Sequence, residues 1–376
     1  MKGKIILTKR LFDENSYISE FTATVTDSIE CDGFYKTVLD QTAFFAEGGG
    51  QKSDTGYLDN IPLFDVQEEN GIIYHFTHSP IEKKEIKGVI DWEKRFNKMQ
   101  NHSAEHVISG IVHTHYGYEN TGFHLGDDVV TMDYSGPLNQ EDIDKIEFLS
   151  NKVVWENRKI TCYYPENTEN LFYRSKLDIK ENLRIVEIDG VDRCACCAPH
   201  VKETGEIGFI KIVSWQKYKG GVRLFMKAGS FAFNEINGYF KALKKLSVLL
   251  SLPMEETPAG VEKLMQKLND TQYQLNGLKL ELLKREINQT DCNFAFVDSA
   301  DLLKDAVNLL NNKFNSICGA FFGNDIDGYR FNIITPDIEA TKTLLKEKLN
   351  ASGGGRDNML QGKTNAKKEE IIRFFN

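Results

Sequence analysis

The stretch His102-Ser103-Ala104-Glu105-His106 carries two histidines four residues apart, and Cys196-Cys197-Ala198-Pro199-His200 repeats that spacing with a cysteine and a histidine. Residues i and i+4 of a helix lie on one face, so His102 and His106 can share one ion. Imidazoles and a thiolate are ligands that zinc prefers in proteins. About 90 residues separate the two pairs, so they can meet only after folding. This spacing predicts a metal site built across a domain rather than a zinc finger.

The expected ligands of one zinc ion are His102, His106, Cys196 and His200. Four protein ligands are typical of a closed structural site, whereas a catalytic zinc keeps an exchangeable position. The sequence does not decide between a structural and a catalytic zinc site. In a catalytic site, one of the four ligands, such as His200, would be held loosely. Because Cys194 and Cys197 crowd around Cys196, the identity of the sulfur ligand stays open too.

The bulk composition is that of a globular chain of two or three domains, with 376 residues of which 41% are hydrophobic. No run of 18 apolar residues occurs, so no membrane span is expected, and the first residues do not resemble a signal peptide. Seven cysteines, an odd number, favour metal binding in a reducing cytoplasm over a disulfide framework. The net charge of −9 argues against indiscriminate nucleic-acid binding.

The pattern of the N-terminal quarter, residues 1–90, predicts a small β-barrel module, because short strand-like runs alternate with turn signals and glycines. A helix is expected from about residue 91. Its apolar stripe, which includes Ala104, Val107 and Ile111, lies opposite His102 and His106. The expected strands are 4–7, 21–27, 34–39, 55–58, 72–76 and 86–89.

The pattern of the whole chain predicts an α+β protein of several domains. Residues 91–235 are expected to form an α+β zinc-binding core, with a helix at 141–157 and strands at 185–188 and 209–214. Residues 236–290 are expected to form a helical hairpin or coiled-coil linker, because leucines recur in steps of three and four between 257 and 287. Residues 291–376 are expected to form a small α/β domain that contains a helix at 339–349 and a loop at Gly353–Gly355. Its basic end, with eight Lys/Arg against four Asp/Glu from 342 to 376, is either a solvated tail or a nucleic-acid surface.

A second motif, Thr42-Ala43-Phe44-Phe45-Ala46-Glu47-Gly48-Gly49-Gly50-Gln51, precedes Asp54-Thr55-Gly56. Three successive glycines let the backbone approach a ligand closely, and their amides can bind an anion or a carbonyl. Thr42 and Gln51 add neutral hydrogen-bonding groups. A flexible barrel turn is the alternative interpretation.

The stretch 102–106 also matches H-x-x-E-H, the inverted signature of zinc peptidases, in which Glu105 would be the general base. That interpretation requires a downstream carboxylate as the third ligand. The Cys196–His200 pair argues against it, because the pair supplies better ligands for zinc.

Five motifs in order carry a resemblance. They are the 42–56 segment, the H-x-x-x-H helix preceded by Arg95 and Met99, the C-x-x-x-H pair, Thr204–Gly208 and Gly220–Arg223. Together they resemble the editing domain of alanyl-tRNA synthetase. The Gly353–Gly355 and Gln361-Gly362 segments resemble the DHHA1 domain that follows it. Because the synthetase catalytic domain has no counterpart, the chain looks like the long form of the free-standing alanyl-tRNA editing proteins, AlaX.

The resemblance implies a cytoplasmic, zinc-dependent hydrolase that deacylates mischarged tRNA(Ala). The resemblance implies Ser-tRNA(Ala), and also Gly-tRNA(Ala), as substrates, and the preference between serine and glycine stays open. By family position Thr42 would contact the serine hydroxyl, and Gln51 with the amides of Gly48, Gly49 and Gly50 would position the substrate. Arg223 would contact the 3′-terminal phosphates. The residues expected to grip the tRNA body are Arg356, Lys363, Lys367 and Lys368.

Two features of the chain differ from the pattern of the family that it resembles. The family commonly has Cys-Gly-Gly-Thr-His where this chain has Cys196–His200, so Pro199 stiffens the loop. No Asp-His-His triplet occurs, so the phosphoesterase that often accompanies DHHA1 is not expected. The alternative is a tRNA-binding module with a structural zinc and no turnover. The 257–287 helix is expected either to pair with another helix of the chain, such as the amphipathic 231–250 segment, or to make a homodimer, for which the C-terminal domain is the other candidate surface.

Overall fold

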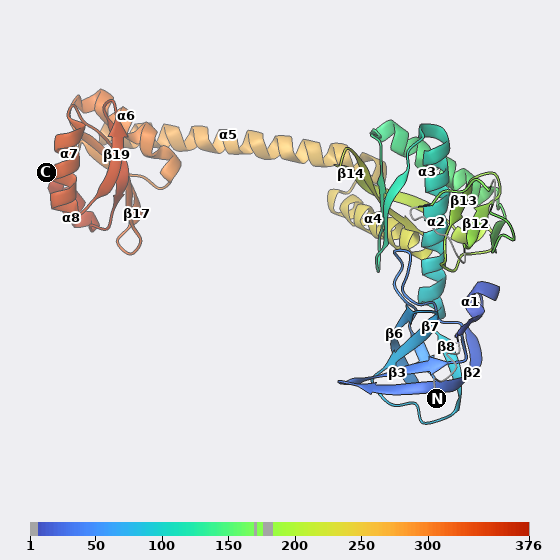
Figure 1. The fold of residues 1–376 in the computed structure, drawn as a ribbon. Helices are drawn as coiled ribbons and strands as arrows, with labels where there is room; N and C mark the ends of the chain where they lie inside the picture. Colours follow the sequence, from blue (N-terminus) through green and yellow to red (C-terminus); the bar gives the residue numbers. More distant parts are fainter. Residues whose placement is uncertain (1–6, 169–170, 176–182, 376) are drawn as a thin grey trace. The chain divides into compact units, whose positions relative to one another are not determined.

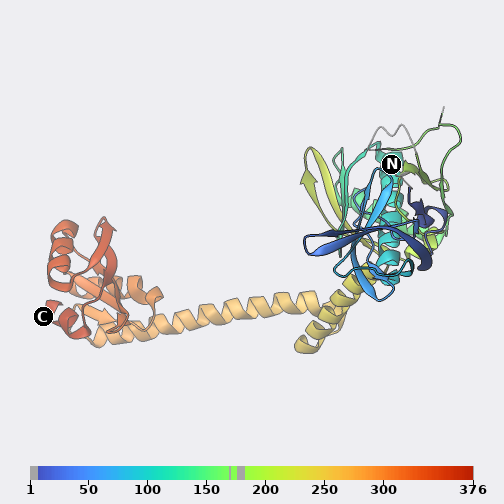
Figure 2. The same ribbon diagram turned by 60° about the horizontal axis from the view of Figure 1, so that its bottom comes forward.

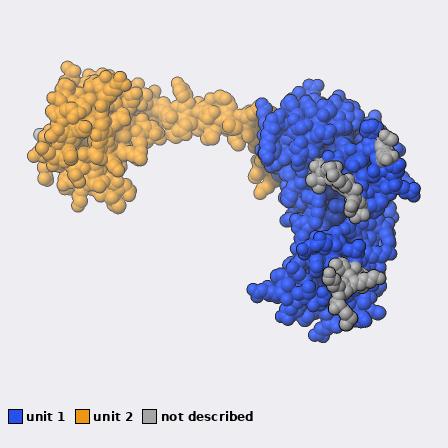
Figure 3. All heavy atoms as spheres, viewed as in Figure 1, with its two compact units in different colours: residues 1–242 blue, residues 243–376 orange. Residues whose placement is uncertain are grey.

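The computed structural model describes residues 7–168, 171–175 and 183–375 (Figure 1). The chain divides into two compact units, residues 1–242 and 243–376 (Figure 3). The strand expected at 4–7 lies outside the described residues except for Leu7, which is not in a strand.

The first unit begins with a closed six-stranded barrel in the order β2-β3-β7-β6-β5-β8. Its interior is filled by aromatic and branched side chains such as Phe21, Phe44, Val66 and Ile73. The sequence did not predict β6, because Pro62 and several acidic residues interrupt its apolar alternation. The strands are β2 (Glu20–Cys31), β3 (Phe34–Leu39), β5 (Gly56–Leu58), β6 (Ile61–Glu69), β7 (Ile72–Thr77) and β8 (Glu85–Ile90).

Helix α2 (Trp92–Tyr116) runs from the barrel through the centre of the first unit (Figure 1). It begins where the Asp91 side chain accepts a hydrogen bond from the Lys94 amide, and it ends at Gly117 with φ of 68°. Its middle turns, from Met99 to Val112, are buried on every face. The sequence indicated only one apolar face, but the opposite, polar face is buried as well.

Two sheets and a second helix pack around α2 and complete the first unit. One sheet has the order β14-β15-β10-β9, and the other has the order β11-β12-β13. Helix α3 (Gln140–Trp155) matches the helix expected at 141–157. The strands are β9 (Asn120–Leu125), β10 (Val130–Tyr134), β11 (Ile160–Tyr163), β12 (Ile185–Ile188), β13 (Asp192–Ala195), β14 (Ile210–Tyr218) and β15 (Gly221–Ala228). The two short strands β1 (Lys9–Arg10) and β4 (Gln41–Thr42) pair beside the barrel, next to α1 (Leu11–Glu14).

The second unit begins inside helix α4 (Gly229–Leu250) and continues into the long helix α5 (Thr257–Gln289) (Figure 2). The leucine seam of α5 is exposed: Leu264 is 57%, Leu268 67% and Leu278 60% accessible. Helix α5 packs through its last turns, at Leu283 and Ile287, against the core of the C-terminal sheet.

The C-terminal sheet has the order β16-β17-β18-β20-β19. The predicted loop at Gly353–Gly355 is wrong, because these glycines lie in the edge strand β19, paired with β20. The end of the chain also folds, as helix α8, whose Ile371 is buried. The elements are β16 (Phe294–Phe296), α6 (Leu303–Phe314), β17 (Cys318–Asn324), β18 (Gly328–Ile334), α7 (Ile338–Leu349), β19 (Ser352–Arg356), β20 (Met359–Thr364) and α8 (Lys368–Phe375). The mixed α and β content predicted from the sequence is confirmed.

Candidate functional site

The two histidines of α2 lie side by side on the polar face of the helix. His102 and His106 are each 2% exposed, and their ring centroids are 5.5 Å apart. The spacing of four residues produces this arrangement, as the sequence predicted.

The Cys196–His200 turn follows β13 and approaches both histidines. The Cys196 Sγ atom lies 3.6 Å from Nε2 of His102 and 3.4 Å from Nε2 of His200. The ligand atoms of His102, His106, Cys196 and His200 all lie within 4.8 Å of one another, so this group could hold a metal ion. The structure therefore brings together all four residues that the sequence singled out.

The sulfur atom in this group is that of Cys196, which the sequence alone could not choose. Cys194 is placed instead in a second, overlapping group with His106 and Asp192. Cys197 is exposed and lies beside the glycine turn, near Gly48 and Gly49.

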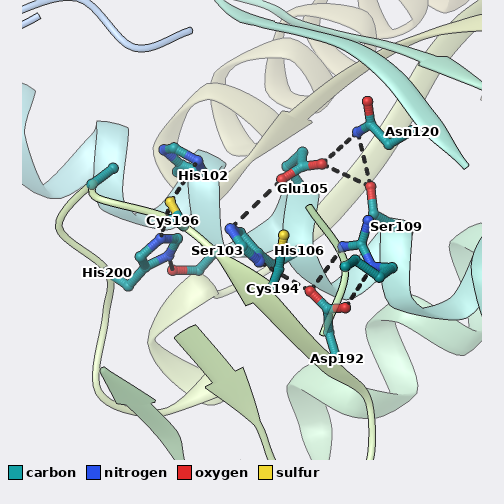
Figure 4. A network of polar contacts seen from close by, with 12 residues as sticks. His102, Ser103, Glu105, His106, Ser109, Asn120, Asp192, Cys194, Cys196 and His200 are labelled. Carbon is teal, nitrogen blue, oxygen red and sulfur yellow. Dashed lines mark hydrogen bonds and ion pairs between the residues drawn. The ribbon is translucent and has the colours of Figure 1, made fainter. Parts of the chain in front are cut away.

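Each of the three histidines has a hydrogen-bonding partner at Nδ1, which leaves Nε2 for an ion. Figure 4 shows Ser103 beside His200 and Asp192 beside His106. The Nδ1 atom of His102 lies 2.8 Å from Gln51 Oε1, and that of His200 lies 3.0 Å from Ser103 Oγ. The Nδ1 atom of His106 lies 3.0 Å from Asp192 Oδ2. Partners at Nδ1 fix the tautomer and the ring orientation of metal-binding histidines. The three partners come from three different segments of the first unit.

The carboxylate of Asp192 is held on its other side by Arg174, through bonds of 2.7 and 2.8 Å. Burial opposes its charge, but the hydrogen bonds from His106 and Arg174 lower the pKa of Asp192 to about 2. Asp192 therefore stays anionic and keeps a proton on Nδ1 of His106.

Burial also affects the charge of the candidate ligands themselves. It holds the pKa of His200 well below its ordinary value and raises the pKa of the Cys196 thiol well above it. A divalent cation reverses the preference of the thiol, because metal binding releases its proton. The donor set therefore fits a cation that accepts neutral imidazoles and one thiolate.

Arg184 fixes the backbone of the Cys196–His200 turn. Its Nη1 atom donates to the carbonyl oxygens of Cys196, at 3.0 Å, and Ala198, at 2.9 Å. The Arg184 side chain is almost fully buried and pairs with Asp13 at 3.3 Å. Arg184 thus holds the backbone of this turn between its two candidate ligands, Cys196 and His200.

The glycine motif forms a tight turn between Gly48 and Gln51, whose backbone groups exchange hydrogen bonds of 3.1 and 3.0 Å. Gly49 and Gly50 have φ values of 59° and 82°, a region that favours glycine. A Cβ on Gly50 would lie 2.6 Å from the Phe123 carbonyl oxygen, so no larger residue fits there. The turn therefore requires its glycines for the close approach to β9.

A cavity of about 470 Å³ opens onto this group of ligands. Its lining combines the glycine turn, the ligand group and three arginines. The lining residues are Arg10, Gly49, Gly50, His102, Glu105, His106, Thr121, Gly122, Phe123, Tyr164, Arg174, Ser175, Arg184, Cys194, Ala195, Cys196 and Cys197.

The structure places Thr42 and Gln51 differently from the expected contacts with substrate. The Thr42 hydroxyl is fully buried in the barrel, 2.8 Å from Nε2 of His75, and Thr42 is not among the cavity-lining residues. Gln51 is 1% exposed and contacts His102 rather than the cavity. Among the described residues its Nε2 atom has no hydrogen-bonding partner.

None of the basic residues expected to contact tRNA is among the described residues that line the cavity. Arg223, on β15, forms two hydrogen bonds with Asp133, of 2.5 and 2.7 Å, and stacks 3.9 Å from the ring of Tyr218. In the second unit, Arg356 ends strand β19 and Lys363 lies on β20, both exposed.

The sequence analysis missed Asp192, Arg174 and Ser103. Asp192 carries no local motif, and its role depends on the pairing of β12 with β13. Ser103 lies between two motif residues, but an ordinary helix serine gives no signal. Only the fold reveals these contacts.

Comparison with known proteins shows that the chain is similar to an alanyl-tRNA editing protein and to alanine–tRNA ligases. Residues 183–225 match the family described as the threonyl and alanyl tRNA synthetase second additional domain. The chain is 26% identical to the alanyl-tRNA editing protein AlaX-L of Pyrococcus horikoshii, with 97% of each chain covered. It is 29% identical to the alanine–tRNA ligase of Methanococcus vannielii, over 97% of this chain and 43% of the ligase. It is 31% identical to the ligase of Halobacterium salinarum, over 73% of this chain and 32% of the ligase. The chain thus spans less than half the length of the ligases it matches.

Proposed function

Because this chain is a relative of the alanyl-tRNA editing proteins, matched over almost its whole length, we propose that it hydrolyses the ester bond of mischarged tRNA(Ala). The observation that carries the proposal is the cavity lined by His102, His106 and Cys196, three of the four residues that could hold a metal ion. A purely structural metal has no need of such an opening. The proposed location, the cytoplasm, follows from this role in translation. Among the described residues, no helix is both long and apolar enough to cross a membrane.

The proposed metal is one zinc ion, held by His102, His106, Cys196 and His200. Zinc supplies a positive charge that polarises an ester carbonyl or acidifies an attacking water. The protein contributes the fixed ring orientations, through Gln51, Asp192 and Ser103. The glycine turn places the Gly49 and Gly50 backbone at the wall of the same cavity, where it would position the substrate.

The proposed substrate is Ser-tRNA(Ala), with Gly-tRNA(Ala) second. A synthetase pocket discriminates only weakly against an alanine analogue that adds a hydroxyl, by about 10²-fold, so a separate hydrolytic site is needed. Recognition of the serine hydroxyl by Thr42 stays a prediction. It would require the Thr42 hydroxyl to leave His75.

The charges of the cavity suit the 3′ end of a tRNA. Arg10 and Arg184 line the cavity, whereas Arg223 is not among its lining residues. Arg223 is neutralised by Asp133 in the sheet, so its proposed phosphate contact would require that pair to open. We propose Arg10 and Arg184 as further phosphate contacts, which would likewise require their pairs with Glu68 and Asp13 to open.

The C-terminal sheet is proposed to grip the tRNA body, as a DHHA1-like domain. Lys363 on β20 lies directly opposite Arg330 on β18, and both are exposed. Like charges in cross-strand pairs are unfavourable, which an anionic partner relieves. The additional contacts proposed here are Arg356, Lys367 and Lys368. Replacing Arg356 and Lys363 by alanine should weaken tRNA binding and make its salt dependence shallower.

A homodimer is proposed through the exposed seam of α5. Its members are Val261, Leu264, Leu268, Leu275, Leu278 and Leu282, which are between 38% and 67% exposed. A heptad seam of this length is typical of a coiled coil. Sedimentation of Leu268→Asp against the unchanged chain would test it, because an aspartate in the seam should shift the protein to monomer.

The peptidase interpretation is not favoured by the geometry. It needs a carboxylate on the ion, and the group of four ligands found among the described residues contains none. Asp192 contacts Nδ1 of His106, the side away from the ligand group.

The test is a deacylation assay with Ser-tRNA(Ala) and Ala-tRNA(Ala), using protein as purified, stripped with a chelator and reloaded with zinc. Hydrolysis of the seryl ester that is lost on stripping and regained on reloading supports the proposal. Cys196→Ala should lose both zinc and activity, whereas Cys197→Ala should keep its zinc. Tight tRNA binding without turnover by the zinc-loaded protein would identify a binding module instead.

A further inference from the structure

Glu105 has no role in the zinc chemistry proposed above. It lies on α2 between the two histidines, is 4% exposed and lines the cavity. Buried carboxylates are costly unless they are paired, so a buried carboxylate at a cavity wall points to a ligand.

One oxygen of Glu105 is fully engaged by neutral donors (Figure 4). The Oε1 atom accepts from Ser109 Oγ at 2.7 Å and from Asn120 Nδ2 at 2.5 Å. Ser109 is in turn 2.9 Å from the Tyr134 hydroxyl. These contacts come from α2, β9 and β10 and fix the direction of the carboxylate.

The other oxygen, Oε2, has no hydrogen-bonding partner in the part of the chain that the structure describes. It lies 3.8 Å from Nε2 of His106, the atom proposed to face the ion. Glu105 does not belong to the group of four ligand atoms. The Oε2 atom therefore lies beside the ligand group, at the cavity wall.

Glu105 is also the sole acidic residue among the described residues that line the cavity, whereas Arg10, Arg174 and Arg184 are cationic. An aminoacyl ester carries its negative charges on the nucleotide phosphates and one positive charge on its α-ammonium group. Each lining arginine is already paired with a carboxylate outside the lining, Arg10 with Glu68, Arg174 with Asp192 and Arg184 with Asp13, and offers nothing to an ammonium group. Only Glu105 offers that group a complementary charge.

We propose that Glu105 binds the α-ammonium group of the aminoacyl ester through its free oxygen and thereby restricts the site to esters with a free α-amino group. The inference rests on the proposed function and deepens it. Serine, glycine and alanine share this group, so Glu105 does not choose between side chains. It selects against N-acylated esters, such as peptidyl esters, and against α-hydroxy esters.

The strength of this selection follows from the cost of leaving the carboxylate unpaired. A site built to bind a polar group rejects an analogue that lacks it, because its own buried group loses its partner. Hydrogen bonds to charged groups correspond to about a 10- to 100-fold change in affinity.

The test uses full-length, zinc-loaded protein and tRNA(Ala) that carries serine through a 3′-amide, which is not hydrolysed. A second probe is the same tRNA with the serine N-acetylated. The dissociation constants of both probes are measured for the unchanged protein, Glu105→Gln and the matched control Glu187→Gln, with zinc content determined for each. Glu187 is a carboxylate of β12 that pairs with Arg193 outside the cavity lining.

We expect the unchanged protein and Glu187→Gln to bind the free-amine probe about 10- to 100-fold more tightly than the acetylated probe. In Glu105→Gln the two probes should bind within about threefold of each other, mainly through loss of affinity for the free amine. Equal binding of both probes by the unchanged protein would overturn the inference, and this comparison needs no variant to fold. A Glu105→Gln protein that keeps the preference, or that weakens both probes equally, would overturn it as well.

The two proposals fail in different ways. If zinc-loaded protein does not hydrolyse the seryl ester, the proposed function is wrong, whatever the amide probes show. If it hydrolyses Ser-tRNA(Ala) and N-acetyl-Ser-tRNA(Ala) at the same rate, the function stands and the role of Glu105 is wrong.

Discussion

The Nδ1 atom of His106 lies 3.0 Å from the Oδ2 atom of Asp192, and the same carboxylate is held by Arg174. This contact directs the opposite ring nitrogen toward His102, Cys196 and His200. A carboxylate behind a metal-binding histidine fixes its tautomer and raises its basicity. Asp192 is therefore part of the proposed zinc site although it does not touch the ion.

Asp192→Asn should lower zinc affinity by about 10- to 100-fold, because the amide no longer supports a protonated Nδ1 with a full negative charge. Competition with a chromophoric chelator measures the affinity. Glu187→Gln is the control, since it also removes one carboxylate from the same three-stranded sheet. Equal zinc affinity in Asp192→Asn and the unchanged protein would show that the contact is only structural.

Gln51→Ala separates two roles for the glutamine. Because Gln51 Oε1 contacts Nδ1 of His102, the variant should bind zinc about tenfold more weakly. Its catalytic rate should recover in part when zinc is added in excess. If zinc affinity is unchanged and kcat/KM falls at saturating zinc, Gln51 acts on the substrate, as the sequence suggested.

Thr42→Val tests the buried hydroxyl. Loss of the hydrogen bond to His75 should lower the free energy of unfolding by about 1 to 2 kcal/mol. We expect the preference for Ser-tRNA(Ala) over Ala-tRNA(Ala) to stay within about twofold, because the side chain is fully buried and outside the cavity lining. A clear loss of that preference, with zinc retained, would return Thr42 to the recognition of serine.

His75 should make the barrel less stable in mild acid. Burial lowers the pKa of His75 from its ordinary 6.5 to about 4. Between these values the unfolded chain binds a proton that the folded chain does not, so stability is complete above pH 6.5 and is lost as the pH falls toward 4. The loss should approach about 1.4 kcal/mol per pH unit.

Denaturant unfolding at several pH values between 4 and 7 measures this effect, with His75→Leu as the comparison. The difference in unfolding free energy between the two proteins should change across this window. A constant difference would show that His75 does not titrate as its burial implies.

The sequence predicted the elements whose structure is determined by a short-range pattern of residues. The spacing of His102 and His106, the helices near 141–157 and 257–287, and most barrel strands follow from periodicity and turn residues. The Cys196–His200 pair was recognisable because its ligand types are themselves the signal. Its convergence with α2 was predicted from zinc chemistry rather than from any local pattern.

Other features depend on long-range contacts that no local pattern encodes. Cys196 is distinguished from Cys194 and Cys197 only by the geometry of its turn, which Arg184 holds. The Gly353–Gly355 segment has the composition of a loop but forms an edge strand, because β20 supplies its hydrogen bonds. Thr42 has a family position that indicates substrate contact, but the closed barrel places its hydroxyl on His75.

X-ray absorption at the zinc edge tests the central claim most directly. For the zinc-loaded protein, the account predicts three nitrogen neighbours from imidazoles and one sulfur neighbour, with the sulfur lost in Cys196→Ala and kept in Cys194→Ala and Cys197→Ala. A zinc shell without sulfur, or one whose sulfur persists in Cys196→Ala, would contradict it.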